Sequence, residues 1–221
     1  KDTKSDCGID VNRRSYRGTI IIKTATRLAN GLTVINSLPV ESYLYGVVAN
    51  EISPEWPSDA IKAQAIAART YALYSINKHK ADGYDVCTST DCQVYGGISS
   101  ESNQTTKAVN ETRGMVINHN GRIIEALFHS SGGGFTENSE NVWGSSVPYL
   151  RGVADYDQKS PHYKWEKEIT PQEMSNILFK AGYKIGDVQA VRLSRIQKPP
   201  CNTKDRGISG RVKSLTIIGT Q

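Results

Sequence analysis

An alanine-rich segment that follows two prolines is the feature that most restricts what this chain can fold into. Ser58 is a good N-cap, and Asp59 adds a negative charge to the first turn that follows. We therefore expect a helix from Ala60 to about Ile76. Small apolar residues recur along one face of it, at positions 61, 65, 68 and 72. Because such a stripe lets another backbone approach closely, we expect this helix to lie at the centre of the fold.

The other predicted elements are short, and most are strands. Strands are expected at 16–23, 31–36, 114–118, 122–128, 192–196 and 211–218. Asn120-Gly121 is a strong turn signal that makes a hairpin of the third and fourth strands. Further helices are expected at 38–48, 105–112 and 171–181. The sequence thus predicts an α+β fold, with a mainly antiparallel sheet packed around the alanine-rich helix and with an inserted lobe or long loops forming a substrate cleft.

Length and charge limit the classes of protein that remain. The 221 residues fit one catalytic domain spanning 1–221, with an inserted lobe around 77–130. No apolar stretch approaches the ~20 residues of a membrane span, and the first six residues are charged or polar, so neither a signal peptide nor an anchor is expected within the sequence. The net charge of +5 suits nucleic acid, an anionic membrane, an acidic cell-wall polymer or an ordinary soluble surface. Lys and Arg are scattered among acidic residues, which disfavours a nucleic-acid site.

Four cysteines, at 7, 87, 92 and 201, allow two disulfides formed outside the cytoplasm. A bond between Cys7 and Cys201 would close a loop of nearly the whole chain and stabilise the fold by about 4–5 kcal/mol in the entropic model. Cys87 and Cys92 lie five residues apart. They are compatible with a disulfide, with free thiols, or with half of a tetrahedral zinc shell.

Glu51 is the most suggestive acidic residue. Apolar residues flank it at 47–49 and 52, and a desolvated carboxyl has the raised pKa that a general acid needs near neutral pH. The alternative is a structural glutamate paired with Lys62 or Arg69, which lie seven residues apart on one face of the expected helix. No nucleophile elbow, P-loop, dinucleotide fingerprint or zinc-protease motif is present.

Several other residues are of types that bind sugars, through aromatic faces, amides and hydroxyls. They are Gln93, Tyr95, Trp143 and Tyr149, each with core packing as its alternative. His129 is expected to be a structural residue or a substrate contact. A hydrolytic triad is disfavoured because Ser130 points to the opposite face of a strand, which leaves Ser131 on the same face. The glycines at 132–134 suit a backbone that passes close to a ligand or a strand.

Taken together, these motifs resemble the stage II sporulation protein D family, which includes amidase enhancers. The segments that carry the resemblance are 38–48, 51–73, Cys92-Gln93-Val94-Tyr95-Gly96-Gly97, 128–138, Val142-Trp143-Gly144, Pro148-Tyr149-Leu150 and Ser209-Gly210-Arg211-Val212. The resemblance runs from about Tyr16 to the end of the chain.

The resemblance implies a peptidoglycan lytic transglycosylase that acts during engulfment in sporulating bacteria. Its substrate would be glycan strands that have lost their stem peptides, and its products would carry 1,6-anhydro-N-acetylmuramic acid ends. Glu51 occupies the position of the catalytic acid. Residues of the matching motifs are expected to bind the sugars or to position Glu51: Lys62, Arg69, Gln93, Tyr95, His129, Ser130, Ser131 and Tyr149.

The resemblance also bears on cofactors, partners and location. Some relatives carry a cysteine pair at the place of Cys87 and Cys92, so zinc is an expected cofactor there without being required, and His79 or His129 could supply a third ligand. The partners implied are denuded glycan strands and sporulation membrane proteins, a cell-wall amidase among them, but no nucleic acid. The place implied is extracytoplasmic, between mother-cell and forespore membranes, with a native N-terminal anchor removed from this sequence. A non-catalytic, glycan-binding amidase enhancer and a zinc hydrolase are the alternatives.

Overall fold

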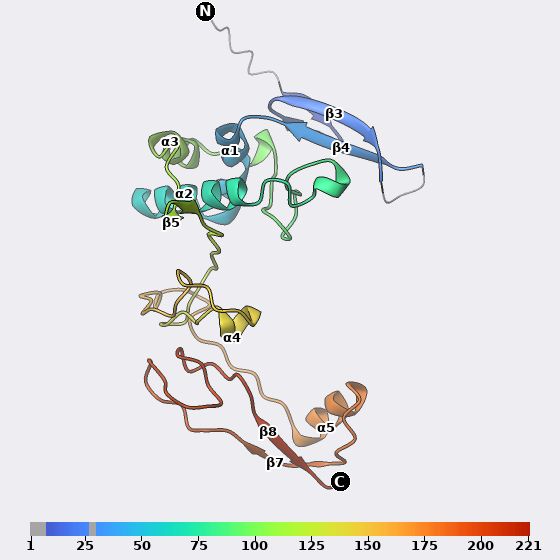
Figure 1. Cartoon of the computed structure of the whole chain (residues 1–221), viewed down its shortest axis with the longest axis vertical. Helices are drawn as coiled ribbons and strands as arrows, with labels where there is room; N and C mark the ends of the chain where they lie inside the picture. Colours follow the sequence, from blue (N-terminus) through green and yellow to red (C-terminus); the bar gives the residue numbers. More distant parts are fainter. Residues whose placement is uncertain (1–7, 27–29) are drawn as a thin grey trace, which may run out of the picture. The chain divides into compact units, whose positions relative to one another are not determined.

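The computed structural model of the chain describes residues 8–26 and 30–221 (Figure 1). The chain divides into two compact units, Lys1–Phe128 and His129–Gln221, and each unit is described by itself. The expected bond between Cys7 and Cys201 falls on a residue outside the described ranges, and the structure gives Cys201 as a free thiol.

The first unit begins with two antiparallel hairpins. One is formed by β1 (Ile9–Val11) and β2 (Arg14–Tyr16), and the other by β3 (Thr19–Thr24) and β4 (Leu32–Ser37). A third, very short hairpin joins β5 (Asn118–His119) to β6 (Arg122–Ile123). Its turn residues, Asn120 and Gly121, have φ values of 51° and 76°, as the predicted turn type requires.

Three helices form the core of this unit. They are α1 (Val40–Glu51), α2 (Ser58–Tyr74) and α3 (Asn103–Glu111), which pack against one another, with short 3₁₀ turns at η1 (Lys80–Asp82) and η2 (Ile98–Ser100). The alanine stripe of α2 is buried in one cluster with apolar residues of α1 and α3 and with Tyr95. Gly46 lets the Tyr95 ring reach α1, because a Cβ at Gly46 would lie 2.6 Å from that ring.

A buried ion pair holds the three helices together. Arg69 of α2 binds both carboxylate oxygens of Glu41 in the first turn of α1, at 3.0 and 2.8 Å. The same guanidinium donates to the backbone oxygens of Val109 in α3 and Met115 beyond it, at 3.0 and 3.1 Å. Glu41 accepts a further bond from the Gly114 backbone N–H. The pair thereby sets the position of α1, which ends at Glu51.

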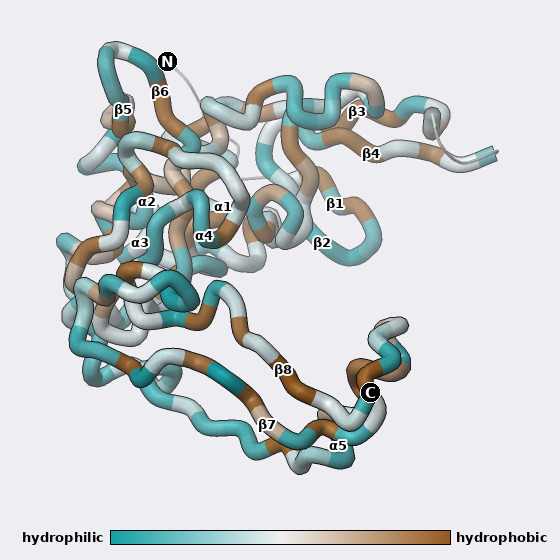
Figure 2. Tube along the Cα trace, turned by 60° about the horizontal axis from the view of Figure 1, so that its bottom comes forward, coloured by the Kyte–Doolittle hydropathy of each residue, from teal (hydrophilic) through white to brown (hydrophobic). Residues whose placement is uncertain are grey.

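The second unit contains α4 (Glu140–Trp143), α5 (Pro171–Lys180) and an antiparallel pair, β7 (Val188–Arg192) with β8 (Thr216–Gly219). Thr170 and Glu173 form a capping box at the start of α5, and Pro171 stands at its first position. Figure 2 shows hydrophobic residues along β8, where Ile217 pairs with Val191 of β7. A glutamate, Glu137, joins residues 137–141 to 207–209 through its carboxylate.

The α+β class is confirmed, but the arrangement differs from the predicted one. Over the described ranges, the strands form four separate two-stranded ladders rather than one sheet. The alanine stripe of α2 packs on α1 and α3, because small side chains favour close approach of helices as much as of strands. Within the part of the chain that the structure describes, no helix is long and apolar enough to cross a membrane.

Candidate functional site

Glu51 lines a cavity of about 360 Å³ in the first unit. It is the last residue of α1, directly before the extended Ile52. The opposite walls come from Tyr71 of α2, from residues 90–94, and from Leu127 and Phe128. The local sequence explains this placement, since Pro54 and Pro57 prevent α1 from continuing past the acid.

The surroundings of Glu51 favour its protonated form. Burial of the half-buried side chain raises the pKa of its carboxyl above the ordinary value, and the backbone N–H of Val94 opposes this by a hydrogen bond. The position at the carboxyl end of α1 acts in the same direction as burial, because the negative end of the helix dipole disfavours a carboxylate. The pKa of Glu51 is thus shifted in the direction that its apolar flank predicts.

Gln93 lines the Glu51 cavity, but its amide is already engaged within the protein. The side chain is only 2% exposed. Its Nε2 donates to the Ala68 backbone oxygen at 3.3 Å, and its Oε1 accepts from the Tyr43 hydroxyl at 3.3 Å. Gln93 thus forms part of the wall behind the cavity, between α1 and α2.

Tyr95 does not line the Glu51 cavity. Its ring is buried in the core, 5.1 Å from the Tyr43 ring between centroids, and its hydroxyl donates to Asn36 at 2.8 Å. Burial raises the pKa of that hydroxyl to about 12. The core-packing alternative therefore describes Tyr95 better than a sugar contact at Glu51 does.

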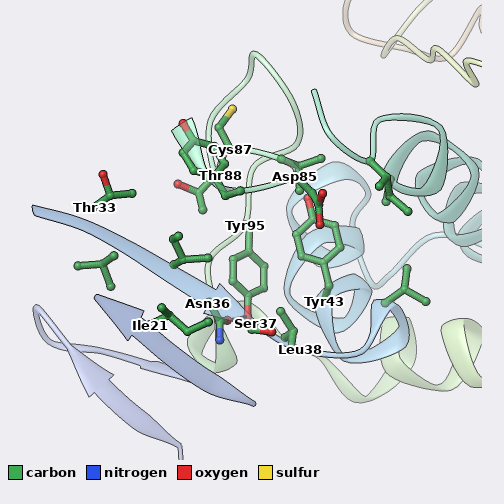
Figure 3. Close-up of a pocket in the computed structure, with 18 of the residues that line it drawn as sticks. Ile21, Thr33, Asn36, Ser37, Leu38, Tyr43, Asp85, Cys87, Thr88 and Tyr95 are labelled. Atoms are coloured by element: carbon green, nitrogen blue, oxygen red, sulfur yellow. Dashed lines mark hydrogen bonds between the residues drawn. The ribbon is translucent and has the colours of Figure 1, made fainter. Parts of the chain in front are cut away.

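A second, larger cavity of about 650 Å³ lies between the β3–β4 hairpin and the loop that carries Cys87. Figure 3 shows Tyr43 and Tyr95 on its inner side, with Asn36 at the Tyr95 hydroxyl. Its lining mixes aliphatic with polar and aromatic residues, and Lys23 and Asp85 add one charge of each sign. Glu51 is not among the residues that line it.

Lys62 and Arg69 do not position Glu51, which corrects the expectation from their spacing. Arg69 is 1% exposed and is engaged by Glu41, so it cannot reach a glycan. Lys62 binds Glu111 of α3 at 2.9 Å. Arg69 thus contacts the start of α1 and α3, and Lys62 contacts α3. The expectation failed because periodicity along α2 does not reveal which neighbouring helix supplies the carboxylate.

Four potential metal ligands meet beside the Glu51 cavity, which two of them, Asp91 and Cys92, also line. His79, Cys87, Asp91 and Cys92 bring one ligand atom each to within 4.8 Å of one another. The His79 Nε2 lies 3.3 Å from the Cys92 sulfur and 3.2 Å from Asp91 Oδ2. Asp91 Oδ2 lies 3.8 Å from each sulfur.

This donor set fits zinc. Ligand atoms around a tetrahedral zinc, with bonds of about 2.0–2.3 Å, lie roughly 3.3–3.8 Å apart. Both cysteines are free thiols. Burial raises the pKa of the Cys92 thiol to about 11, whereas for Cys87 the opposing effect of burial is outweighed by hydrogen bonds from Cys92 and Ser89, which lower its pKa. Of the two histidines considered, His79 is in the cluster, and Asp91 is a fourth potential ligand that the sequence did not reveal.

The remaining sequence-predicted residues belong to the second unit. His129 and Ser130 are exposed there, and Ser131 and Tyr149 are half-buried. The Ser131 hydroxyl donates to Asp157. Trp143, at the end of α4, is 59% exposed, so its core-packing alternative is wrong.

Tyr71, Leu127 and Phe128 also line the Glu51 cavity, and the sequence analysis did not single them out as site residues. Tyr71 is 9% exposed and its hydroxyl points toward the Asp91 backbone oxygen, at 3.5 Å. Its position three residues after Ala68 places it next to the alanine stripe, which is the signal that could have identified it.

The fold and the site define an α+β protein in which a half-buried glutamate lines a cavity beside a cluster of thiols. The particular family follows from comparison with known proteins. Residues 29–119 match the SpoIID family model, described as stage II sporulation protein. The chain therefore carries a domain of the stage II sporulation protein D family.

Curated relatives agree with this assignment. Stage II sporulation protein D of Bacillus subtilis is 36% identical over 173 residues, which cover 71% of this chain and 50% of the relative. The amidase enhancer of Bacillus subtilis is 44% identical over 131 residues, 59% of this chain and 17% of the relative. An uncharacterised protein of Brachyspira hyodysenteriae is 36% identical over 172 residues, 77% of this chain and 46% of the relative. The chain thus spans half or less of the length of these relatives.

Proposed function

We propose that this chain is a peptidoglycan lytic transglycosylase, with Glu51 as its general acid and base. The substrate is the bond between N-acetylmuramic acid and N-acetylglucosamine in glycan strands that lack stem peptides. The observation that carries the proposal is the Glu51 carboxyl, which lines a cavity and whose pKa is raised by burial.

A single carboxyl can serve both steps of this reaction. Glu51 first protonates the glycosidic oxygen, and the bond from that oxygen to C1 of the muramic acid breaks. The carboxylate that remains accepts the proton of the C6 hydroxyl of the same sugar, whose oxygen forms a new bond to C1. The product is a 1,6-anhydro end, no water is consumed, and Glu51 returns to its protonated form.

The protein would contribute orientation as well as the proton. Because the nucleophile belongs to the substrate, the reaction has the advantage of an intramolecular attack once the sugar is held in place. Within the first unit, Tyr71 and Phe128 offer aromatic surface beside Glu51. His129, Ser130, Ser131 and Tyr149 are proposed as glycan-binding residues of the second unit by residue type.

Mass spectrometry of the products tests the proposal. Purified chain is incubated with denuded glycan strands, and anhydro ends are counted against reducing ends. Anhydro ends that increase with enzyme concentration are expected. Reducing ends instead would show hydrolysis, and the absence of any new end would refute an enzymatic role.

The second candidate is a non-catalytic amidase enhancer, and the observation that favours it is the similarity to the relative with that name. It predicts that the chain binds denuded strands without cleaving them and accelerates a cell-wall amidase on intact peptidoglycan. Assaying the same preparation with and without such an amidase separates the two candidates.

The rate is expected to fall as pH rises through the pKa of Glu51. The acid must be protonated in the free enzyme, and burial raises its pKa above 4.5, so activity should persist above the range of an ordinary glutamate. Tyr71, Asp91 and Cys92 line the same cavity and are the other titratable groups facing it. Measuring kcat/KM against pH checks this, with circular dichroism over the same range as the control for folding. A kcat/KM that rises steadily above pH of about 4.3 would contradict the assignment.

We also propose zinc as a structural cofactor held by His79, Cys87, Asp91 and Cys92. Bound there, a metal ion would cross-link the loop from 79 to 92. That cross-link would stabilise the Glu51 cavity, because Gln93 directly follows Cys92 and lines the cavity. The reaction steps above do not pass through the metal.

Metal analysis of the purified chain is expected to find about one zinc per molecule. Cys92→Ser should lower that content severalfold, and cobalt-loaded wild type should show thiolate-to-cobalt absorption that this variant lacks. Cys201→Ser is the matched control, because its sulfur lies in the second unit and contacts the Gln197 backbone oxygen. Equal metal content in wild type and Cys92→Ser would overturn the proposal. Activity that survives complete metal removal would exclude a zinc hydrolase.

The setting proposed for this activity is extracytoplasmic, beside sporulation membrane proteins that include an amidase. The relatives named for sporulation protein D and for amidase enhancement support it. An amidase that removes stem peptides would supply the denuded strands that the transglycosylase uses.

A further inference from the structure

A single carboxylate gathers the hydrogen-bond donors of the glycine-rich loop in the second unit. Asp157 accepts the backbone N–H of Gly133 at 2.9 Å and that of Gly134 at 2.8 Å. The Ser131 hydroxyl donates to it as well. These hydrogen bonds, that from Ser131 foremost, hold the pKa of Asp157 below its ordinary value, so it is ionised throughout the neutral range.

A second carboxylate, that of Asp155, accepts the remaining backbone N–H of the glycine run. Asp155 accepts the backbone N–H of Gly132 at 3.1 Å, and the Asp155 N–H donates to the Gly134 oxygen at 3.0 Å. A Cβ at 132 would lie 2.3 Å from the Asp155 carboxylate, so a larger residue there would displace this acceptor from the loop. The consecutive N–H groups of residues 132–134 thus form an anion-binding concavity that the chain fills with its own aspartates.

The carbonyl groups of the same loop are held by one arginine. Arg211 donates to the Gly132 oxygen at 2.6 Å and to the Phe135 oxygen at 2.8 Å. Glu137 accepts from the backbone N–H groups of Ile208 and Ser209, both at 3.2 Å, which anchors the segment that carries Arg211. The N–H groups and the carbonyl groups of the loop are therefore both bound by charged side chains from distant parts of the chain.

These contacts order a loop that its three glycines would otherwise leave flexible. Three consecutive glycines have a large conformational entropy when free, and Gly133 and Gly134 have φ values of 61° and 92°, which other residues rarely adopt. A loop that orders only on binding weakens the affinity by the cost of ordering it. Ionic hydrogen bonds to its N–H and carbonyl groups remove that cost in advance, and the segment they fix, residues 131–135, directly follows the exposed His129 and Ser130.

We propose that Asp157, assisted by Asp155 and Arg211, is a positioning residue that holds His129, Ser130 and Ser131 in the conformation that binds glycan. This inference rests on the proposed function, since it takes denuded glycan as the ligand of that segment. It also gives a purpose to the Ser209-Gly210-Arg211 motif, which the reaction at Glu51 leaves unexplained.

Two measurements on Asp157→Asn and Asp157→Ala test the inference in the full chain. Amide hydrogen exchange at 132–134 should accelerate about tenfold or more, as expected for loss of hydrogen bonds to a charged group. The Kd for denuded glycan strands should weaken by a similar factor of about ten. In turnover, KM should rise more than kcat falls. Arg211→Lys, which keeps the charge but loses the fork, should give a smaller change in the same direction.

Asp187→Asn is the matched control, because Asp187 is an exposed aspartate of the same unit. Should Asp157→Ala fail to fold, Asp157→Asn and Arg211→Lys decide the question. Fast loop exchange together with a wild-type Kd for glycan would overturn the positioning role. A wild type that neither binds nor cleaves glycan would instead refute the proposed function, and this inference with it; a wild type that cleaves while the variants bind and cleave equally well refutes the inference alone.

Discussion

Glu51→Gln is expected to lower the release of 1,6-anhydro ends by at least a factor of about 100–10,000, the range for loss of a general acid. The amide has almost the shape of the carboxyl but can neither donate the proton to the glycosidic oxygen nor accept that of the C6 hydroxyl. Mass spectrometry of digested denuded strands measures the effect. Binding of the strands should persist, since the cavity walls keep their shape.

The stability of Glu51→Gln distinguishes a catalytic role from a structural one. Burial raises the pKa of Glu51, which means that the folded protein disfavours the charged form of this carboxyl relative to the unfolded chain. Removing that charge should leave the free energy of unfolding unchanged or increase it, while activity is lost. Glu55→Gln, at an exposed position in the connection between α1 and α2, is the matched control and should keep full activity. Anhydro ends released by Glu51→Gln at the wild-type rate would show that the acid lies elsewhere.

Local signals in the sequence anticipated many of the elements, because they depend on near neighbours. The alanine stripe identified α2, Asn120-Gly121 identified the β5–β6 turn, and the helix expected at 171–181 matches α5. The start of α2 was two residues late in the prediction, because Pro57 rather than Ser58 occupies the N-cap. The strands were expected to join one sheet, but pairing across a sheet depends on distant segments that periodicity cannot reveal.

The candidate site shows the same difference between local signals, which the sequence reveals, and contacts between distant residues, which it does not. The apolar flank of Glu51 was readable from the sequence, and it corresponds to the burial that raises the pKa. The partner of Arg69 was not readable, since Glu41 lies 28 residues away on another helix. Asp91 was missed as a ligand because an exposed aspartate beside a cysteine carries no signal of its own until the chain folds His79 against it.

Breaking the buried ion pair between Glu41 and Arg69 is the second large effect that we expect. Arg69→Met should lower the free energy of unfolding by about 3–5 kcal/mol, because the Glu41 carboxylate is then left buried without its partner. The substitution should also remove the hydrogen bonds that the guanidinium donates to the backbone oxygens of Val109 and Met115. Urea unfolding followed by far-ultraviolet circular dichroism measures the change, since the pair joins α1, α2 and α3.

The double variant Glu41→Leu with Arg69→Met separates the cost of an unpaired charge from the loss of the pair itself. Replacing both partners with apolar residues removes the stranded charge, so the double variant should be more stable than Arg69→Met alone. Lys62→Met is the control on the same helix. It removes a cation whose pair with Glu111 lies at the surface, where solvent screens it, and should shift the midpoint much less. If the double variant loses as much free energy of unfolding as the two single variants lose together, the ion pair is not the contact that holds α1. If Arg69→Met loses glycan binding while it remains fully folded, Arg69 acts on the substrate after all.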